Sequence, residues 1–499
     1  MNEGAFRKAL VVLIIFGVLT KVIVSFQNGI SDPDTWWHLA AGKYIADLRA
    51  VPHQDIFSWT VAGQPWITHE WLLELLFYLS YLVGKFWGVL ALVLFLCGTL
   101  LLFYWKLLSM PKDSFYVAAL ALLVTGELIT PFIDIRPQVL SYLLFVFFLY
   151  ALYSFVYEDR DFLFALPLLS LLWANSHGSF LLGAALLVLF IFSVLIPMEG
   201  GKIVNPRFRI SKAGKLTLVL ILCLVTPTVN PNGFKLLLYP FETLGNSQMT
   251  GTIQEWLSPN FHDLYYQVFL VYYLATFLVL VITPRNILLS DLLLYLIFGA
   301  AAFIHIRLIP YALLTSGLLW PRYLSLKTTH LPKLSRIKIA VIPSLFIPFM
   351  LVLFLKAPPQ TQIDYKFTPQ DSIFPVKAVE YLRANPVTGR MLNDYGWGGY
   401  LIWNLPEHKV FIDGRADVYF KKVYGDYLKV NRLKPETAFL LNKYRVGFVL
   451  MPADAPLIQA LKFSPDWSVC YEDTKAAILV NKKWSASGKT LTGQRTKGD

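Results

Sequence analysis

Long runs of apolar residues alternate with short polar segments over most of this chain. Each run of roughly 17–25 residues is long enough to cross about 30 Å of hydrocarbon as an α-helix. The predicted spans are 10–26, 86–105, 115–131, 138–157, 162–175, 179–197, 216–229, 266–283, 287–304, 308–320 and 339–356. The pattern therefore predicts a polytopic α-helical membrane domain with about eleven transmembrane helices over residues 1–356.

The composition agrees with a membrane protein. Of the 499 residues, 56% are hydrophobic and only 15% are charged, whereas a soluble protein carries about a quarter charged residues. The net charge of +12 would suggest a nucleic-acid partner for a soluble chain. Here the basic residues lie in short loops, where they set membrane topology, so we expect no nucleic-acid partner. The three cysteines are far apart, which indicates no disulfide framework.

Basic residues gather in alternate loops. Loops 198–215 and 321–338 each hold five Lys or Arg residues, and Arg7 and Lys8 precede the first span. The positive-inside rule places such loops in the cytoplasm. We therefore expect a multi-pass protein of the cytoplasmic membrane with a cytoplasmic amino terminus and an extracytoplasmic carboxy-terminal domain.

The opposite loops carry a different set of residues, namely scattered acids, histidines and two arginines. They are Asp32, Asp34, His38, His69, Glu70, Asp134, Arg136, His177, Glu255, Asp263, His305 and Arg307. A single outward-facing polar site is the simplest explanation. Ordinary loop polarity accounts for some of these residues, but poorly for the two arginines, which oppose the charge bias and lie beside apolar runs.

The large outer loop 27–85 predicts two helices that lie on the membrane. Asp32 is suited to cap a helix over 32–48, and Asp34 favours the positive end of its dipole. A second helix is expected from Thr68 to Leu82, with Glu70 in its first turn and Glu74 one turn later. Asp34 has no capping duty, which favours it as the chemical carboxylate. The two glutamates, and Glu74 above all, are explained better as the solvated side of an interfacial helix than as site residues.

One span followed by a large outer loop, with an acidic pair at its start and two membrane-parallel helices, resembles the GT-C superfamily of integral-membrane glycosyltransferases. That group includes protein O-mannosyltransferases, oligosaccharyltransferase catalytic subunits and bacterial lipid A aminoarabinose transferases. The resemblance covers the architecture of nearly the whole chain and implies eleven to thirteen spans, often with a globular carboxy-terminal domain. Its motif is the pair Asp32 and Asp34. The intervening proline is unusual for the family and leaves open which carboxylate acts.

Further residues are candidates for binding substrate. A guanidinium can grip phosphate through two hydrogen bonds, so Arg136 and Arg307 are expected to bind a donor phosphate, with a local Asp134–Arg136 pair as the alternative. The remaining candidates are His177, Glu70, His69, Glu255, His38 and His305. A divalent metal is a possible cofactor among these acids and histidines, as in the oligosaccharyltransferase branch. No helical His-x₃-His spacing indicates one, and no other cofactor is expected.

Beyond Lys356 the composition changes to that of a small soluble α/β domain over 357–499. The expected helices are 371–384, 421–443 and 455–463, and the expected strands are 388–393, 409–413, 446–451, 467–472 and 476–481. The glycine-rich segment 393–400 lacks Gly-x-Gly-x-x-Gly spacing and suits a surface that meets sugars or packs onto the membrane domain. Residues 411–417 end a strand either at a functional site or at a plain Asp-Gly turn.

These features predict an inverting glycosyltransferase that moves a sugar from a polyprenyl-phosphate donor to a lipid, glycan or protein acceptor on the outer face of the membrane. Asp34 or Asp32 would accept the proton of the acceptor, and membrane lipids would surround the enzyme. One alternative is a transporter or flippase of a lipid-linked or anionic solute, although transporters tend to carry charges at mid-membrane and repeated halves. The other is a non-catalytic component of envelope polysaccharide assembly.

Overall fold

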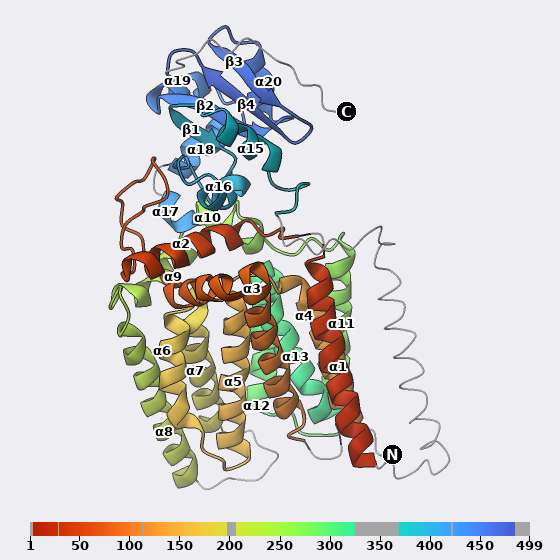
Figure 1. Cartoon of the computed structure of the whole chain (residues 1–499). Coiled ribbons are helices and arrows are strands. Elements are labelled where there is room, and N and C mark those ends of the chain that lie inside the picture. Colours follow the sequence, from red (N-terminus) through yellow and green to blue (C-terminus); the bar gives the residue numbers. More distant parts are fainter. Residues whose placement is uncertain are drawn as a thin grey trace.

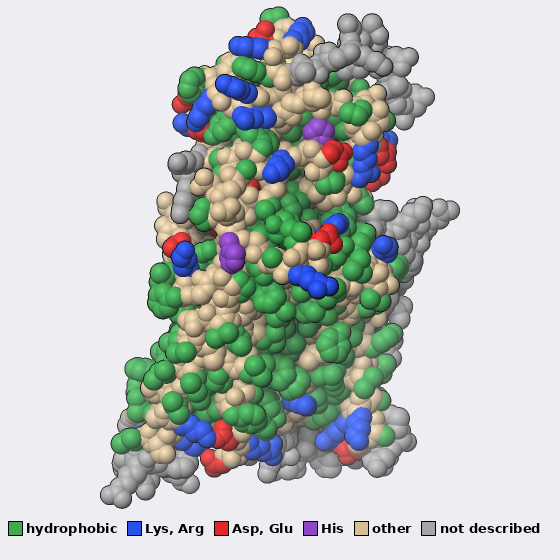
Figure 2. All heavy atoms as spheres, turned by 60° about the vertical axis from the view of Figure 1, so that its left-hand side comes forward, with side chains coloured by type: hydrophobic (Ala, Val, Ile, Leu, Met, Phe, Trp, Pro, Cys, Tyr) green, Lys and Arg blue, Asp and Glu red, His purple; other side chains and the backbone are tan. Residues whose placement is uncertain are grey.

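The computed structural model of the chain describes residues 3–27, 29–111, 114–196, 206–324, 369–420 and 423–484. A bundle of helices forms one end of the molecule and a mixed α/β domain forms the other, with the amino terminus at the far end of the bundle (Figure 1). On the face drawn in Figure 2, hydrophobic side chains form a broad belt over the bundle, and charged side chains gather below and above it. This distribution is the one that a lipid bilayer imposes on a helical membrane protein.

The bundle helices follow the apolar runs of the sequence. They are α1 (Glu3–Ser25), α3 (Trp71–Leu108), α4 (Phe115–Ile129), α5 (Gln138–Tyr157), α6 (Leu166–Ala174), α7 (Leu181–Leu195), α8 (Pro206–Val225), α11 (Leu264–Ile282), α12 (Leu289–Ile304) and α13 (Ile309–Tyr323). Among the described residues, seven helical segments are long and apolar enough to cross a membrane, and 163–174 and 289–304 are shorter apolar helices. The multi-span membrane fold is confirmed. The number of spans stays a prediction, and the run 339–356 lies outside the described residues.

Short helices connect these elements. They are η1 (Thr130–Phe132), η2 (Leu163–Ala165), η3 (Gly178–Phe180), η4 (Thr226–Thr228), α9 (Lys235–Leu244), α10 (Ser247–Thr250), η5 (Gln254–Trp256) and η6 (Ile306–Leu308). Of these, η1, η3, η5 and η6 adjoin predicted site residues. We call the end of the bundle nearest the α/β domain the domain end.

The two predicted surface helices are present, although their starts differ from expectation. Helix α2 spans Asp34–Leu48, and Asp32 accepts a hydrogen bond from the amide of Asp34 at 3.1 Å. The predicted cap at Thr68 is wrong, because its hydroxyl donates instead to the carbonyl of Pro52 at 2.6 Å. Non-helical backbone at Gly84 and Lys85 divides α3. Its first part therefore lies across the domain end and its second part descends through the bundle (Figure 1).

Helix α2 is buried on more sides than the single face that its sequence pattern predicts. Trp36 and Leu39 are buried in addition to Trp37. The reason is that α2 lies between α3 and α16 (Gly398–Asn404) of the α/β domain. The ring of Trp36 packs edge-on against Phe86 of α3 and Tyr400 of α16, with centroids 5.3 and 5.5 Å apart. The glycine-rich segment thus packs onto the membrane domain.

The α/β domain is built on a four-stranded mixed sheet with strand order β1-β2-β4-β3. Strand β1 (Arg390–Asn393) runs parallel to β2 (Val446–Pro452), with Leu392 opposite Val449, whereas β4 (Ala476–Asn481) is antiparallel to both β2 and β3 (Trp467–Glu472). Its helices besides α16 are η8 (Tyr395–Trp397), α15 (Val376–Ala384), α17 (Ala416–Tyr419), α18 (Val423–Asn431), α19 (Thr437–Lys443) and α20 (Pro456–Lys462). The predicted soluble α/β domain is confirmed in its described part.

Two secondary-structure predictions for this domain are wrong. Residues 409–413 form no strand apart from an isolated bridge between Val410 and Ser58. The amide side chain of Asn393 binds the backbone there, donating to Ile412 O and accepting from Phe411 N at 2.8 Å each. The single helix expected over 421–443 is divided into α18 and α19, because Leu433 has left-handed backbone geometry with φ of 51°.

Buried polar contacts tie the α/β domain to the first long loop. The indole of Trp59 donates to the carbonyl of Met391 at 2.9 Å. The guanidinium of Arg415 is almost fully buried and pairs with Asp55 of the loop and with Asp413 of its own domain, at 2.7 Å each. Removing one member of such a buried set leaves uncompensated charge. Segment 411–417 therefore forms an interdomain joint.

Close backbone contact between the two parts predicts the effect of a single methyl group. A Cβ added at Gly399 would lie 2.3 Å from the carbonyl oxygen of Pro33, at the start of α2. We expect Gly399→Ala to cost about 1–3 kcal/mol by overpacking and to lower the melting temperature of the detergent-solubilised protein. Gly214→Ala is the control, because nothing lies within 4 Å of its added Cβ. Equal melting temperatures for the two variants would contradict this packing.

Candidate active site

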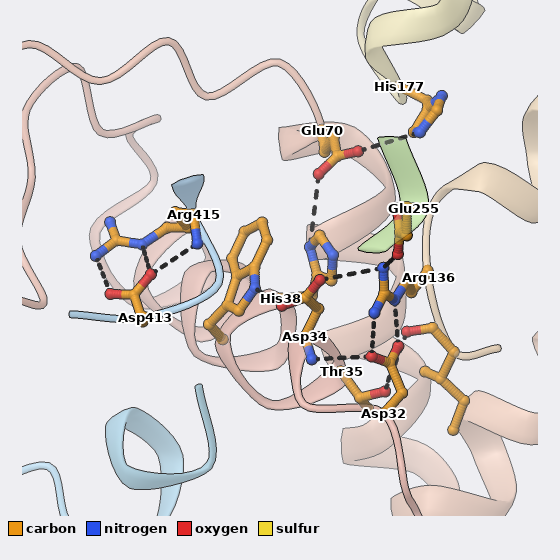
Figure 3. Close-up of polar contacts among 12 residues, drawn as sticks. Asp32, Asp34, Thr35, His38, Glu70, Arg136, His177, Glu255, Asp413 and Arg415 are labelled. Atoms are coloured by element: carbon orange, nitrogen blue, oxygen red, sulfur yellow. Dashed lines mark hydrogen bonds and ion pairs between the residues drawn. The ribbon is translucent and has the colours of Figure 1, made fainter. Parts of the chain in front are cut away.

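Loops that are far apart in the sequence meet at the domain end of the bundle. The start of α2 supplies two acids, the turn between η1 and α5 supplies Arg136, and η5 supplies Glu255 (Figure 3). The hydroxyl of Thr35 on α2 donates to the carbonyl of Ile135 at 3.3 Å, which holds the first two segments together. The polar site predicted from membrane topology therefore exists as a spatial cluster.

The guanidinium of Arg136 lies at the centre of this cluster. Its Nε and Nη2 atoms contact the two carboxylate oxygens of Asp32, both at 2.5 Å. Its Nη1 atom lies 2.5 Å from Glu255 and 3.2 Å from Asp34. A planar guanidinium matches a carboxylate in this two-point geometry. Arg136 thus pairs with three distant acids rather than with its neighbour Asp134.

The two acids at the start of α2, Asp32 and Asp34, differ in their exposure to solvent and in how fully their oxygens are bound. Asp32 has both oxygens on Arg136, and only 4% of its side chain is exposed. Asp34 is 19% exposed; its Oδ1 accepts a hydrogen bond from the indole of Trp37 at 3.0 Å. The geometry therefore leaves Asp34 more accessible to a substrate, while Asp32 orients Arg136.

Burial and crowding shift the titration of these carboxyl groups. Burial, together with the nearby charges of Asp32 and Glu255, raises the pKa of Asp34 to about 7 against the opposing effect of Arg136. Burial also raises the pKa of Asp134 to about 7, and Asp32 adds to the effect. Burial opposes ionisation of Glu255, yet Arg136 and Arg307 hold its pKa below the usual value. The site thus contains a carboxyl group poised near neutral pH, as a general base requires.

A second cluster, of histidines and glutamates, adjoins the first. His38 Nδ1 lies 3.2 Å from Glu74 Oε1 and 3.9 Å from Glu70 Oε2. The other oxygen of Glu70 lies 3.6 Å from His177 Nε2 and 3.7 Å from His69 Nε2. Burial raises the pKa of Glu70 to about 8 and lowers the pKa of His38 and His177. The expectation that Glu74 faces solvent is wrong, because its side chain is 1% exposed.

The remaining two candidates lie beside Trp256. His305 Nδ1 contacts the carbonyl oxygen of Trp256 at 2.6 Å. The guanidinium of Arg307 stacks over the Trp256 ring, 4.4 Å from its centroid. Within the described part of the chain, Arg307 forms no ion pair with a carboxylate. Its charge therefore remains available to an anionic ligand, whereas the charge of Arg136 is already surrounded by acids.

The cluster around Arg136 and the cluster around Glu70 differ in their ability to bind a divalent cation. The guanidinium of Arg136 occupies the space between the carboxylates of Asp32, Asp34 and Glu255, so these acids do not fit a metal in this arrangement. His38, Glu70 and Glu74 each offer a ligand atom, and these atoms lie within 4.8 Å of one another. One nitrogen and two carboxylate oxygens suit a metal such as Zn²⁺.

The structure also contains contacts to the first cluster that sequence reasoning missed. A Cβ added at Gly414 of the α/β domain would lie 1.9 Å from Asp34 Oδ1, so this backbone is pressed against the carboxylate. Glu74 joins the second cluster one helical turn after Glu70. The spacing of these glutamates was a usable signal for their shared face, whereas the approach of Gly414 depends on how the two parts pack. The predicted residue Asp263 is exposed.

Arg136 predicts a non-additive effect on stability. Arg136→Leu leaves three neighbouring carboxylates without their counter-charge, and we expect a loss of about 3–5 kcal/mol. Adding Asp32→Asn to this variant removes one unpaired acid and should restore part of the melting temperature. Arg432→Leu, at an exposed position, is the control. An Arg136→Leu protein as stable as this control would contradict the central role of the guanidinium.

No protein-family model and no curated protein matches this chain. Among solved structures, it is similar to the oligosaccharyltransferase AglB from the archaeon Archaeoglobus fulgidus in complex with an inhibitory peptide and a dolichol-phosphate. The TM-score is 0.56 at 11% sequence identity, covering 98% of this chain and 75% of that one.

Two further structures of the Archaeoglobus fulgidus oligosaccharyltransferase agree. The apo form gives a TM-score of 0.56 at 12% identity over 97% of this chain and 75% of that one. The form tethered to an acceptor peptide with an NVT sequon gives a TM-score of 0.55 at 12% identity, over 97% of this chain and 74% of that one. The predicted architecture is therefore confirmed as a likeness of fold: 97–98% of this chain shares the fold of these oligosaccharyltransferase structures.

Proposed function

We propose that this chain is a membrane glycosyltransferase that moves a sugar from a polyprenyl-phosphate-linked donor to a lipid, glycan or protein acceptor, with inversion at the anomeric carbon. The observation that carries the proposal is Asp34, an accessible carboxylate with a pKa raised to about 7, beside a fixed guanidinium at the domain end. The fold adds support, since the similar AglB structure holds a dolichol-phosphate. A polar site at the edge of an apolar bundle suits a donor whose tail stays in lipid.

The site belongs, in this proposal, on the extracytoplasmic face. The membrane domain would comprise residues 1–356 and the extracytoplasmic domain residues 357–499. Basic side chains gather at the opposite end of the bundle (Figure 2), where Lys212 and Lys215 pair with Asp159 and Asp161. A cytoplasmic location for that end follows the positive-inside rule.

Asp34 would act as the general base. It would accept the proton of an acceptor hydroxyl while that oxygen bonds to the anomeric carbon. The bond between this carbon and the phosphate oxygen breaks in the same displacement, so the configuration inverts and the phosphate leaves with the electron pair. Arg307 would stabilise the departing phosphate because, among the described residues, its guanidinium forms no direct ion pair with an acid. Asp32 and Arg136 would position Asp34.

The remaining candidates would have supporting roles. Glu255 holds Arg136 from the side opposite Asp32, and His305 fixes the backbone of Trp256, on which Arg307 stacks. A divalent cation, where bound, would be held by His38, Glu70 and Glu74 and would supply a fixed positive charge there. His69 and His177 would orient Glu70, since both face the same oxygen.

The distinct roles of the two aspartates predict different consequences of their replacement. Asp34→Asn should lower transfer by about 10²–10⁴-fold by removing the base, with little change in melting temperature. Asp32→Asn should lower the melting temperature as well, because Arg136 loses its two-point partner. The assay is incorporation of radiolabelled sugar from a polyprenyl-phosphate donor. Asp47→Asn is the control on the same helix, since Asp47 is in an exposed pair with Lys43.

Two outcomes of this assay would decide against the proposal. Full transfer by both aspartate variants would exclude a carboxylate base at the start of α2. No transfer by the native protein with any polyprenyl-linked donor would instead favour a non-catalytic component of polysaccharide assembly.

The raised pKa of Asp34 predicts the pH dependence of transfer. A base acts only when ionised, so activity should rise with pH through about 7 and level off above it. The negative charge of Glu255 contributes to the high pKa, so Glu255→Gln should move this rise to lower pH. The measurement is kcat/KM against pH for both proteins. A rate independent of pH between about 6 and 8, or a shift toward higher pH in the variant, would contradict this assignment.

A further inference from the structure

We infer that His38, Glu70 and Glu74 form a divalent-metal site that clamps helix α2 to the start of α3. The site is separate from the carboxylates around Arg136, where the guanidinium already supplies the positive charge. His38 lies in α2, Glu74 lies in the first turn of α3, and Glu70 is the residue that precedes α3. The chemical class of the ligand is a first-row transition-metal cation, with Zn²⁺ as the best-matched example.

The distances between the ligand atoms suit such an ion. A tetrahedral metal with bonds of about 2.0–2.2 Å has ligand atoms about 3.3–3.6 Å apart. His38 Nδ1 lies 3.2 Å from Glu74 Oε1 and 3.9 Å from Glu70 Oε2, and all three atoms fit within 4.8 Å. An ion can therefore enter between them with small side-chain rotations. The mixed nitrogen and oxygen set favours zinc-like metals over Mg²⁺ or Ca²⁺, which prefer oxygen alone.

A buried oxygen without a hydrogen-bond partner gives independent support for a cation site. Oε2 of Glu74 is buried and has no hydrogen-bond partner among the described residues, and the side chain is only 1% exposed. A buried carboxylate oxygen without a partner is costly. A single nitrogen of His38 faces both glutamates, so it cannot be a close partner for both carboxyl groups. A divalent cation would satisfy both acids together.

The surroundings supply the supporting contacts that metal sites use. The second oxygen of Glu70 faces His177 Nε2 at 3.6 Å and His69 Nε2 at 3.7 Å. Small rotations would let these imidazoles donate hydrogen bonds to that oxygen, and such partners orient a metal-ligating carboxylate. The ring of His69 lies against Tyr239, with centroids 4.4 Å apart, which holds it in place. Glu70 is 12% exposed and provides the side from which an ion can enter.

The position of the site assigns the metal a positioning role. His38 follows Asp34 by one helical turn on α2, and Glu74 lies in the first turn of α3. A metal between them would fix the face of α2 that presents Asp34 to the substrate. This consequence for transfer depends on the proposed function, whereas the existence of the site does not.

Metal content tests the site without any transfer assay. The full-length, untagged protein in detergent is equilibrated with excess Zn²⁺, passed through metal-free buffer and measured by inductively coupled plasma mass spectrometry. We expect one zinc per native chain, and at least a tenfold loss of affinity in His38→Ala, Glu70→Gln and Glu74→Gln. Zinc should raise the melting temperature of the native protein but not those of the three ligand variants. His262→Ala and Glu242→Gln, at exposed positions, are the matched controls and should keep the metal.

Two results would overturn this inference. The first is a native protein that retains no zinc. The second is a bound zinc that survives all three ligand substitutions, or that is lost instead in Asp34→Asn and Asp32→Asn, which would place it among the carboxylates. Should a ligand variant fail to fold, the visible absorption of Co²⁺ bound to the native protein still reports whether a tetrahedral nitrogen and oxygen site exists. An inactive protein that binds zinc as expected would contradict the proposed function alone.

Discussion

The pairing of one guanidinium with three carboxylates organises the domain end of this protein. Asp32, Asp34 and Glu255 each lie more than a hundred residues from Arg136 in the sequence. An unpaired charge of this kind is energetically costly at the edge of a bilayer. Their mutual neutralisation lets two loops close over the ends of the helices. Burial, together with the charges of the two neighbouring acids, also raises the pKa of Asp34 to about 7. The cluster around Arg136 therefore both holds the loops together and shifts the titration of Asp34.

The α/β domain completes this arrangement. It covers α2 from the side opposite the helix bundle, through Trp36 and Tyr400, and it brings the backbone of Gly414 against Asp34. The buried Arg415, held by Asp55 and Asp413, fixes this contact. Helix α2 is thereby enclosed between two domains. Water is largely excluded from Asp34, so burial is the main cause of its raised pKa. A surface helix exposed to water would leave a carboxyl group at its ordinary pKa.

Much of the fold follows from local sequence patterns. The apolar runs located the bundle helices, and four of the five expected strands are present. The expected end of the second surface helix at Leu82 lies two residues before the break in α3 at Gly84. The errors arise where contacts with distant residues override local preference. The side chain of Asn393 forms hydrogen bonds with Phe411 N and Ile412 O, which a strand over 409–413 would use to pair with a neighbouring strand. Thr68 donates its hydroxyl hydrogen to the carbonyl of Pro52 rather than capping a helix.

The candidate site shows the same limit. Charge bias along the chain was sufficient to predict that acids, histidines and arginines gather on one face. It could not predict which residues pair. Asp134 is the acid nearest to Arg136 in the sequence, whereas Asp32 is the acid that Arg136 binds at two points in the structure. Helical spacing relates Glu74 to Glu70, but only packing against α2 buries it beside His38. The roles of these residues in catalysis stay predictions.

An experimental density map of the protein with a bound polyprenyl phosphate would test the central claim most directly. The predicted result is a phosphate beside Arg307, within reach of Asp34, while Arg136 still grips Asp32 and Glu255. A phosphate bound elsewhere, or an Arg136 that has left the three acids, would contradict it.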